Sequence, residues 1–164
     1  MNEVPVKDRA MNLENRGHDA WTVDVFVYLH SQTPGDFTVE SYLQSDPGSS
    51  NLVFYNRHHP GFDVTFHLID ETGLGYRFPQ ASNKQDAIWS QLGNSCPTTP
   101  VWEVFDKHGM ILGPQGLSIT AHNPNEGTAV GEFRYTLNVS QSGNPPYLAL
   151  DPGGTNNNGS TSRQ

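Results

Sequence analysis

Cysteine is almost absent from this sequence, because Cys96 is the only one in 164 residues. A single cysteine cannot form a disulfide within the chain, so we expect the fold to rest on a hydrophobic core. Sparse cysteine is typical of a reducing compartment. Since residues 1–17 also lack the apolar segment of a secretion signal, we expect a cytoplasmic protein.

Basic residues are also few: 9 Lys and Arg stand against 17 Asp and Glu, and the formal net charge is −8. No basic stripe is available to neutralise a row of phosphates, so we expect neither nucleic acid nor an anionic membrane as a partner. Apolar runs are short, and none approaches the roughly 20 residues that span a bilayer.

Turn-forming residues are plentiful, with 16 Gly and 12 Pro beside a hydrophobic fraction of 34%. This composition favours many short strands over a few long helices. Several segments alternate apolar and polar residues with a period of two, which predicts strands with one buried face. The clearest of these segments are residues 21–30, 62–68, 117–122 and 133–140.

Alternation of this kind, with turns about every 8–12 residues, is typical of antiparallel sheets that face water on one side. We therefore predict an all-β fold, an antiparallel two-sheet sandwich of immunoglobulin-like or Greek-key type with at most one short helix. The residues predicted to point into its core are Val23, Val25, Val27, Phe62, Val64, Phe66, Phe133, Tyr135, Leu137 and Val139.

Residues 82–93 differ from the strand pattern. Ser82 and Gln85 form a capping-box sequence, and the apolar residues that follow fall on one helical face before Gly93. This predicts a short helix, and the alternative is an irregular strand through residues 88–92.

Both ends of the chain are poor in apolar residues. We expect residues 1–17 to be a disordered arm, although Val4, Val6, Met11 and Leu13 could pair weakly with an edge strand. We expect residues 152–164, rich in Gly, Asn and Ser, to be a disordered tail. The folded domain is then predicted at residues 18–151.

Motifs for catalysis or cofactor binding are missing: there is no Gly-x-Ser-x-Gly elbow, phosphate loop or dinucleotide fingerprint, and we predict no cofactor. Glu103, Asp106 and His108 have the residue types for acid–base catalysis. They fall around a turn without an evident nucleophile or oxyanion donor, so we do not assign catalysis to them. A small-molecule enzyme on a β scaffold stays the second alternative function, and it requires a deep pocket.

Histidine is frequent, with seven in the chain. His58 and His59 stand together in a predicted turn, and His67 lies on the strand that follows. Adjacent residues point in different directions, so such histidines seldom ligate one ion together. We expect most of these histidines to be exposed and without a ligand. Metal binding is the first alternative function, and it would use some of His30, His58, His59, His67, His108 and His122.

Two further metal sites are excluded by spacing. A blue-copper site needs Cys, His and Met close together on one loop, whereas here Cys96 is followed by Pro97, and His108 and Met110 lie further along the chain. Residues 151–159 offer oxygen ligands, but they lack the ordered spacing and closing Glu of a calcium loop.

Aromatic residues give the remaining functional signal. Phe26 and Tyr28 fall on the outward face of the strand at residues 21–30, opposite the inward Val25 and Val27. Outward aromatics can form a contact patch, unless the predicted helix or a terminal arm covers them. We therefore predict a non-enzymatic binding or assembly module that presents a sheet face or edge strand to a protein partner or to another copy of itself.

Overall fold

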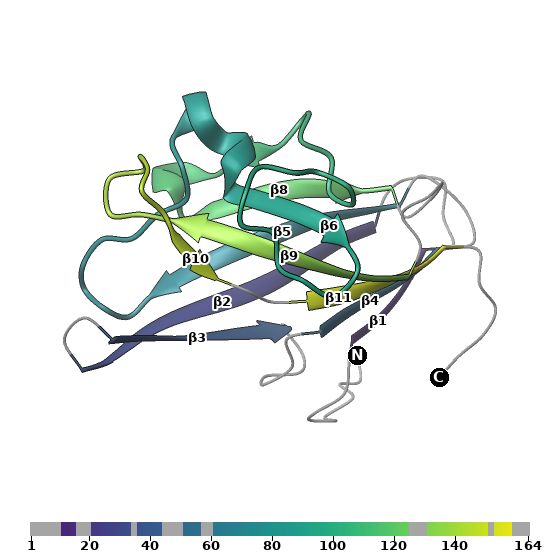
Figure 1. Ribbon diagram of the computed structural model, residues 1–164, viewed down its shortest axis with the longest axis horizontal. Helices are drawn as coiled ribbons and strands as arrows, with labels where there is room; N and C mark the ends of the chain where they lie inside the picture. The colour runs from purple at the N-terminus through teal and green to yellow at the C-terminus, as the bar shows by residue number, and fades with distance from the viewer. Residues whose placement is uncertain are drawn as a thin grey trace.

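Over the residues that the structure describes, the fold is all-β, with two sheets and two short 3-10 segments (Figure 1). No helix among the described residues is long and apolar enough to cross a membrane. The computed structural model describes residues 11–15, 21–33, 36–43, 51–56, 61–124, 131–150 and 153–158, and their side chains over 22–29, 61–124 and 132–150.

The first sheet, called the β2–β5–β8 sheet, has the strand order β3-β2-β5-β8-β7. Strand β2 pairs in parallel with β5, whereas the other neighbours are antiparallel. The strands are β2 (Trp21–Thr33), β3 (Asp36–Leu43), β5 (Phe62–Asp70), β7 (Ile111–Leu112) and β8 (Ser118–Asn123).

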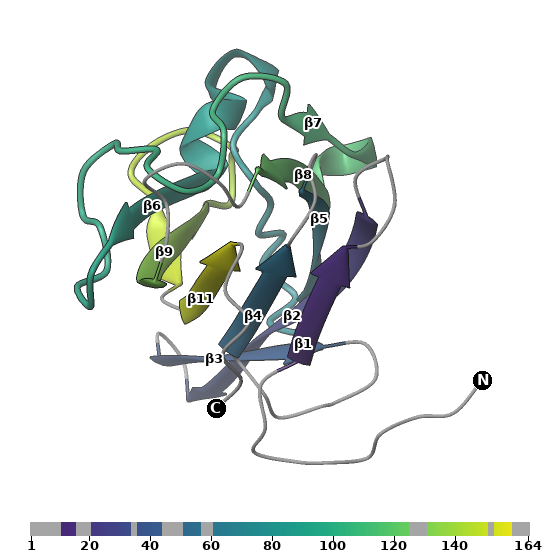
Figure 2. The ribbon, with the colours of Figure 1, turned by 90° about the vertical axis from the view of Figure 1, so that its right-hand side faces the viewer.

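The second sheet, called the β9 sheet, has the order β1-β4-β11-β9-β10, with β6 on the other edge of β9. Strands β10 and β11 pair with the same edge of β9 in one continuous register. Figure 2 shows β9, β11, β4 and β1 side by side in one layer. The strands are β1 (Met11–Asn15), β4 (Asn51–Asn56), β6 (Ile88–Leu92), β9 (Gly131–Val139), β10 (Leu148–Leu150) and β11 (Gly153–Asn158).

Both sheets are mixed, which corrects the prediction of antiparallel sheets. The pairs β1–β4, β4–β11 and β2–β5 are parallel. The sequence pattern did not reveal this, because a strand with one buried face alternates whichever way its neighbour runs.

The structure also places strands in both end segments that were expected to be disordered. Strand β1 lies within residues 1–17 and β11 within residues 152–164, and both pair with β4. The β11 sequence, Gly-Gly-Thr-Asn-Asn-Asn, has no apolar residue, so periodicity could not identify it. It pairs through its backbone with β4 on one side and β9 on the other. The domain limits at residues 18 and 151 stay a prediction.

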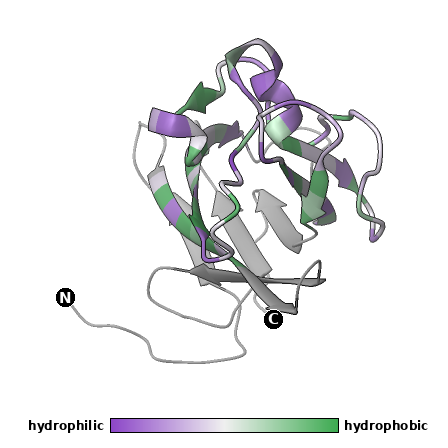
Figure 3. Cartoon of the chain, turned by 90° about the vertical axis from the view of Figure 1, so that its left-hand side faces the viewer, coloured by the Kyte–Doolittle hydropathy of each residue, from purple (hydrophilic) through white to green (hydrophobic). Residues whose placement is uncertain are grey.

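The core lies between the two sheets. Rings from both sheets meet there, with Phe66 of β5 and Tyr135 of β9 at 5.6 Å between centroids and Phe105 at 5.7 Å from Tyr135. Hydrophobic and hydrophilic residues alternate along the strands, as Figure 3 shows. All of the residues predicted to point inward are buried, so the sequence assigned these faces correctly.

Residues 81–87 form a short 3-10 helix and residues 88–92 form a strand. The predicted helix is therefore present only in its first part, and the alternative strand through residues 88–92 is confirmed. Segment η1 (Ala81–Ala87) has no side-chain cap, and Asn83 has non-helical dihedrals of −123° and 19°. From Ile88 onward the chain is β6, paired with β9. The second 3-10 segment, η2 (Pro114–Gly116), precedes β8.

Ser90 joins the free edge of β6 to the following connection. Its backbone N–H donates to Val101 O at 2.8 Å, and its carbonyl accepts from Glu103 N at 2.8 Å. Its Oγ accepts from the backbone N–H groups of Val104 and Phe105 at 3.2 and 3.0 Å. These bonds satisfy buried backbone groups and place Phe105 in the core.

The core assignment predicts a large cost for truncating Phe66. We expect Phe66→Ala to lower the free energy of unfolding by about 3–5 kcal/mol, because it removes a fully buried ring and leaves a cavity. Urea unfolding measures the change, and Ile111→Ala, at a side chain that is 63% exposed, is the control expected to stay within about 0.5 kcal/mol. An unchanged unfolding midpoint for Phe66→Ala would contradict the face assignment.

Tyr135 places an unsatisfied hydroxyl group inside this core. Its Oη is buried without a hydrogen-bond partner, and burial raises the pKa of Tyr135 far above its usual range. We expect Tyr135→Phe to stabilise the protein by about 1 kcal/mol, because the unpaired hydroxyl is removed.

The variant should also lose less stability above about pH 10, where tyrosine ionises only in the unfolded chain. Urea unfolding at neutral and alkaline pH tests both effects. Tyr147→Phe, which removes a hydroxyl bonded to Asp86, is the contrasting control and should destabilise at neutral pH. A less stable Tyr135→Phe would show that the hydroxyl has a partner.

Candidate interaction face on the β2–β5–β8 sheet

The outward positions of β2, β5 and β8 share one face, opposite the core. Parallel pairing sets Asp24 beside Thr65 and Phe26 beside His67, and antiparallel pairing sets Thr65 beside Thr120. We call this surface the outward face, and it consists of Asp24, Phe26, Tyr28, Asp63, Thr65, His67, Thr120 and His122.

The two aromatic candidates lie on this face as the alternation predicted. Phe26 and Tyr28 are half-buried, whereas Val25 and Val27 beside them are buried. The Phe26 ring stacks on the His67 imidazole, with centroids 4.8 Å apart and planes inclined by 20°. A cross-strand stack of this kind fixes both rings on the sheet surface.

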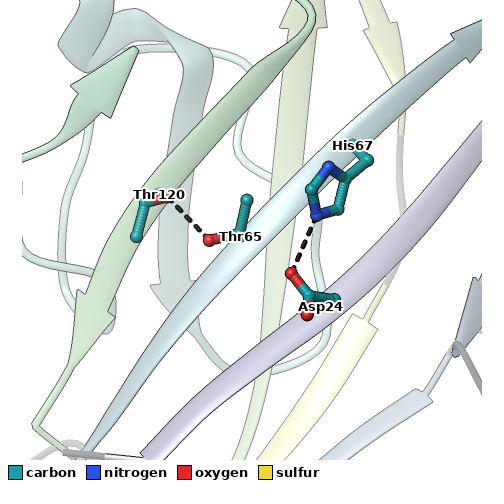
Figure 4. A network of polar contacts seen from close by, with 4 residues as sticks. All are labelled: Asp24, Thr65, His67 and Thr120. Carbon is teal, nitrogen blue, oxygen red and sulfur yellow. Dashed lines mark hydrogen bonds and ion pairs between the residues drawn. The ribbon is translucent and has the colours of Figure 1, made fainter. Parts of the chain in front are cut away.

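His67 is also bound from β2. Its Nε2 lies 2.8 Å from Asp24 Oδ1, and the two side chains are 33% and 49% exposed. Figure 4 shows the imidazole turned toward this carboxylate. His67 therefore has an aromatic neighbour and a carboxylate neighbour, both contributed by β2. The contact is open to solvent, so it orders the face more than it stabilises the fold.

Two further cross-strand bonds complete the face. Thr65 Oγ1 and Thr120 Oγ1 lie 2.7 Å apart (Figure 4). His122 Nδ1 lies 2.8 Å from Asp63 Oδ1, with the side chains 29% and 41% exposed. The polar groups of three strands are thus held in fixed positions while remaining within reach of a partner.

The equivalent outer positions of β9 are covered. Thr136 and Asn138 are each 1% exposed, although they point away from the buried Tyr135 and Leu137. Thr136 Oγ1 donates to Pro97 O at 2.8 Å, and Asn138 Nδ2 donates to Asp86 O at 2.7 Å. The segment between β6 and β8, with η1, therefore covers this part of the β9 sheet, whereas the outward face of the other sheet stays half-exposed.

Catalysis has little support from this geometry. A His bonded to Asp through Nδ1, as in His122 and Asp63, is a pair that hydrolases use to orient a general base. Within the part of the chain that the structure describes, no hydroxyl is bonded to either imidazole, and Thr65 and Thr120 bond to each other. The site is also an open sheet face rather than a deep pocket.

The three residues considered for acid–base catalysis, Glu103, Asp106 and His108, differ in their surroundings. Glu103 accepts a hydrogen bond from Leu92 N at 2.8 Å, and Asp106 N donates to His122 O at 2.9 Å. His108 is exposed. Cys96 is half-buried.

The metal candidates are only partly described. His58 and His59 lie outside the described residues, and His67 is bonded to Asp24. Among the residues that the structure describes, no group of three or more His, Cys, Asp or Glu side chains could hold a metal ion. The involvement of His58 and His59 in a metal site stays a prediction.

Comparison with known proteins adds no family: no protein-family model matches the chain, and no curated protein matches it. Function is therefore inferred from the geometry of the outward face. The sequence pattern identified Phe26, Tyr28 and His67, but it did not reveal either His–Asp pair or the Thr pair. Their outward positions were visible in the alternation, but pairing them required the strand register.

The two His–Asp bonds predict opposite imidazole tautomers. In the neutral ring, the nitrogen bonded to a carboxylate must carry the proton, so His67 should be protonated on Nε2 and His122 on Nδ1. Long-range ¹H–¹⁵N spectra at alkaline pH measure this. Asp63→Ala should return His122 to protonation on Nε2 and leave His67 unchanged. Identical tautomers in the parent protein would contradict the arrangement.

Proposed function

We propose that this protein is a non-enzymatic binding module that recognises a protein partner through the outward face. The observation that carries the proposal is the ordered aromatic centre, Phe26 stacked on His67 beside the half-exposed Asp24. An aromatic centre edged by polar groups that need no further ordering is the composition of a protein interface. Tyr28 extends the same surface along β2.

The charge of the face and of the chain favours a cationic partner. Asp24 and Asp63 are 49% and 41% exposed, and the chain has a formal net charge of −8. Two such chains repel one another, so a partner with exposed Arg or Lys fits the face better than a second copy does. Self-association through this face or an edge strand is an outcome that the test below distinguishes.

We also propose a finer fold class, an immunoglobulin-like or Greek-key sandwich, and a cytoplasmic location. Two sheets packed around one core support an immunoglobulin-like or Greek-key sandwich, although the parallel pairs β2–β5 and β4–β11 depart from that pattern. A cytoplasmic location is supported by the single cysteine, Cys96.

The test replaces the two aromatic side chains of the outward face by charged ones and leaves the net charge of the chain unchanged. Phe26→Glu combined with Tyr28→Lys should weaken binding of the isolated, purified partner at least about tenfold, because buried aromatic anchors dominate interface energies. The matched control is Leu74→Glu combined with Leu117→Lys, which charges exposed apolar residues elsewhere. Titration calorimetry measures affinity, and circular dichroism confirms that both variants fold.

Equal affinity for the parent and the face variant would refute the proposal. Light scattering that shows a dimer lost only in the face variant would replace the cationic partner by a second copy. Stoichiometric zinc or copper in protein purified without an affinity tag would replace protein binding by the metal function.

A further inference from the structure

A groove of about 480 Å³ lies beside the loop that follows β9, and it shares no lining residue with the outward face. Tyr76 forms part of its lining, and the rest comes from residues between 140 and 148. In Figure 1 this loop joins β9 to β10. The volume falls within the roughly 300–1,000 Å³ of small-ligand sites.

The lining combines aromatic rings with neutral polar groups. Tyr76 and Tyr147 contribute the rings, while Gln141, Ser142 and Asn144 contribute amides and hydroxyls. No lining residue is charged. Amides and hydroxyls both donate and accept hydrogen bonds, so this set suits a ligand whose own groups do the same.

The Tyr147 side of the groove is held rigidly by Asp86. Tyr147 Oη donates to Asp86 Oδ2 at 3.3 Å, and Trp89 Nε1 donates to Asp86 Oδ1 at 3.2 Å. The Trp89 and Tyr147 rings meet edge to face, 6.5 Å apart. Burial and the Asp86 carboxylate raise the pKa of Tyr147, so the phenol stays protonated near neutral pH.

Tyr76 is fixed through its backbone by Asp70. One carboxylate oxygen of Asp70 accepts from Gly75 N at 3.1 Å and Tyr76 N at 2.9 Å, and the other accepts from Thr72. Burial acts to raise the pKa of Asp70, but these bonds from Thr72, Tyr76 and Gly75 outweigh it and lower that pKa. The turn that carries Tyr76 is therefore ordered before a ligand arrives.

The loop on the polar side is also ordered. Gln80 N donates to Gly143 O at 3.0 Å, and Gln80 Nε2 donates to Asn144 Oδ1. This leaves the Nδ2 group of Asn144 as a donor with no partner among the described residues. A groove with fixed walls loses little entropy when it binds.

Ser140 supplies an independent observation that points to a ligand. It lines the groove, is 6% exposed, and its Oγ has no hydrogen-bond partner among the described residues. Its backbone pairs with Arg77, which fixes the main chain but leaves the hydroxyl unused. A buried hydroxyl without a partner is rare, and rotation about χ1 can turn it toward the groove.

We propose that this groove binds a neutral carbohydrate, with Tyr76 and Tyr147 against the apolar face of a sugar ring and Ser140 and Asn144 on its hydroxyls. Sugar hydroxyls donate and accept, as the lining groups do. An anionic ligand has no cation in the lining to meet, and a cationic ligand has no carboxylate there. The site is independent of the outward face, so it extends the proposed function.

The experiment titrates the ¹⁵N-labelled full chain with neutral sugars. The probes are glucose, galactose, mannose, N-acetylglucosamine and their β1,4- and α1,4-linked trisaccharides. We expect at least one to shift the amide signals of Tyr76 and residues 140–148 in a saturable manner. Ser140→Ala and Asn144→Ala should each weaken that binding about threefold or more, whereas the exposed Asn94→Ala should not change it.

Three results would overturn the proposal. The first is the absence of saturable shifts with every sugar at concentrations of tens of millimolar. The second is saturation of the same signals by inorganic phosphate or a proline-rich peptide but by no sugar. The third is unchanged sugar affinity in both Ser140→Ala and Asn144→Ala, with unaltered spectra elsewhere showing that the variants fold.

Discussion

The contact between the sheets through Phe66 and Tyr135 determines where the other features of the molecule lie. These rings are 5.6 Å apart, and Phe105 packs against both. Because side chains alternate along a strand, burial of Phe66 forces Thr65 and His67 to face outward. The outward face is therefore a direct consequence of the core, and a one-residue slip in register would destroy both.

Phe105 reaches this ring cluster from a connection that has little regular structure, and Ser90 makes that possible. The Ser90 backbone and hydroxyl bond to residues 101–105, so this connection makes one parallel β-bridge with β6, between Ser90 and Trp102. Leu92 N is satisfied by the Glu103 carboxylate. The edge of β6 is thus closed by its own chain, which protects it from pairing with other molecules.

The sequence predicted the parts of this fold that depend on burial and missed those that depend on backbone pairing. Alternation identified the inward residues of β2, β5 and β9, and it placed Phe26 outward. It could not reveal β11, which has no apolar residue, or the parallel direction of β2 and β5. The same limit applies to the site: His67 and Asp24 are 43 residues apart, and only the register of two parallel strands brings them together.

Asp86 explains why the two sheets present different surfaces. Its carbonyl accepts from Asn138 and so helps to cover the outer side of β9, while its carboxylate accepts from Trp89 and from Tyr147, which lines the groove. The segment that removes one sheet face from solvent therefore also builds a groove wall. The other sheet has no such cover on its described outward residues, which remain half-exposed. Because the groove and the outward face share no residue, ligands at the two surfaces are not expected to compete.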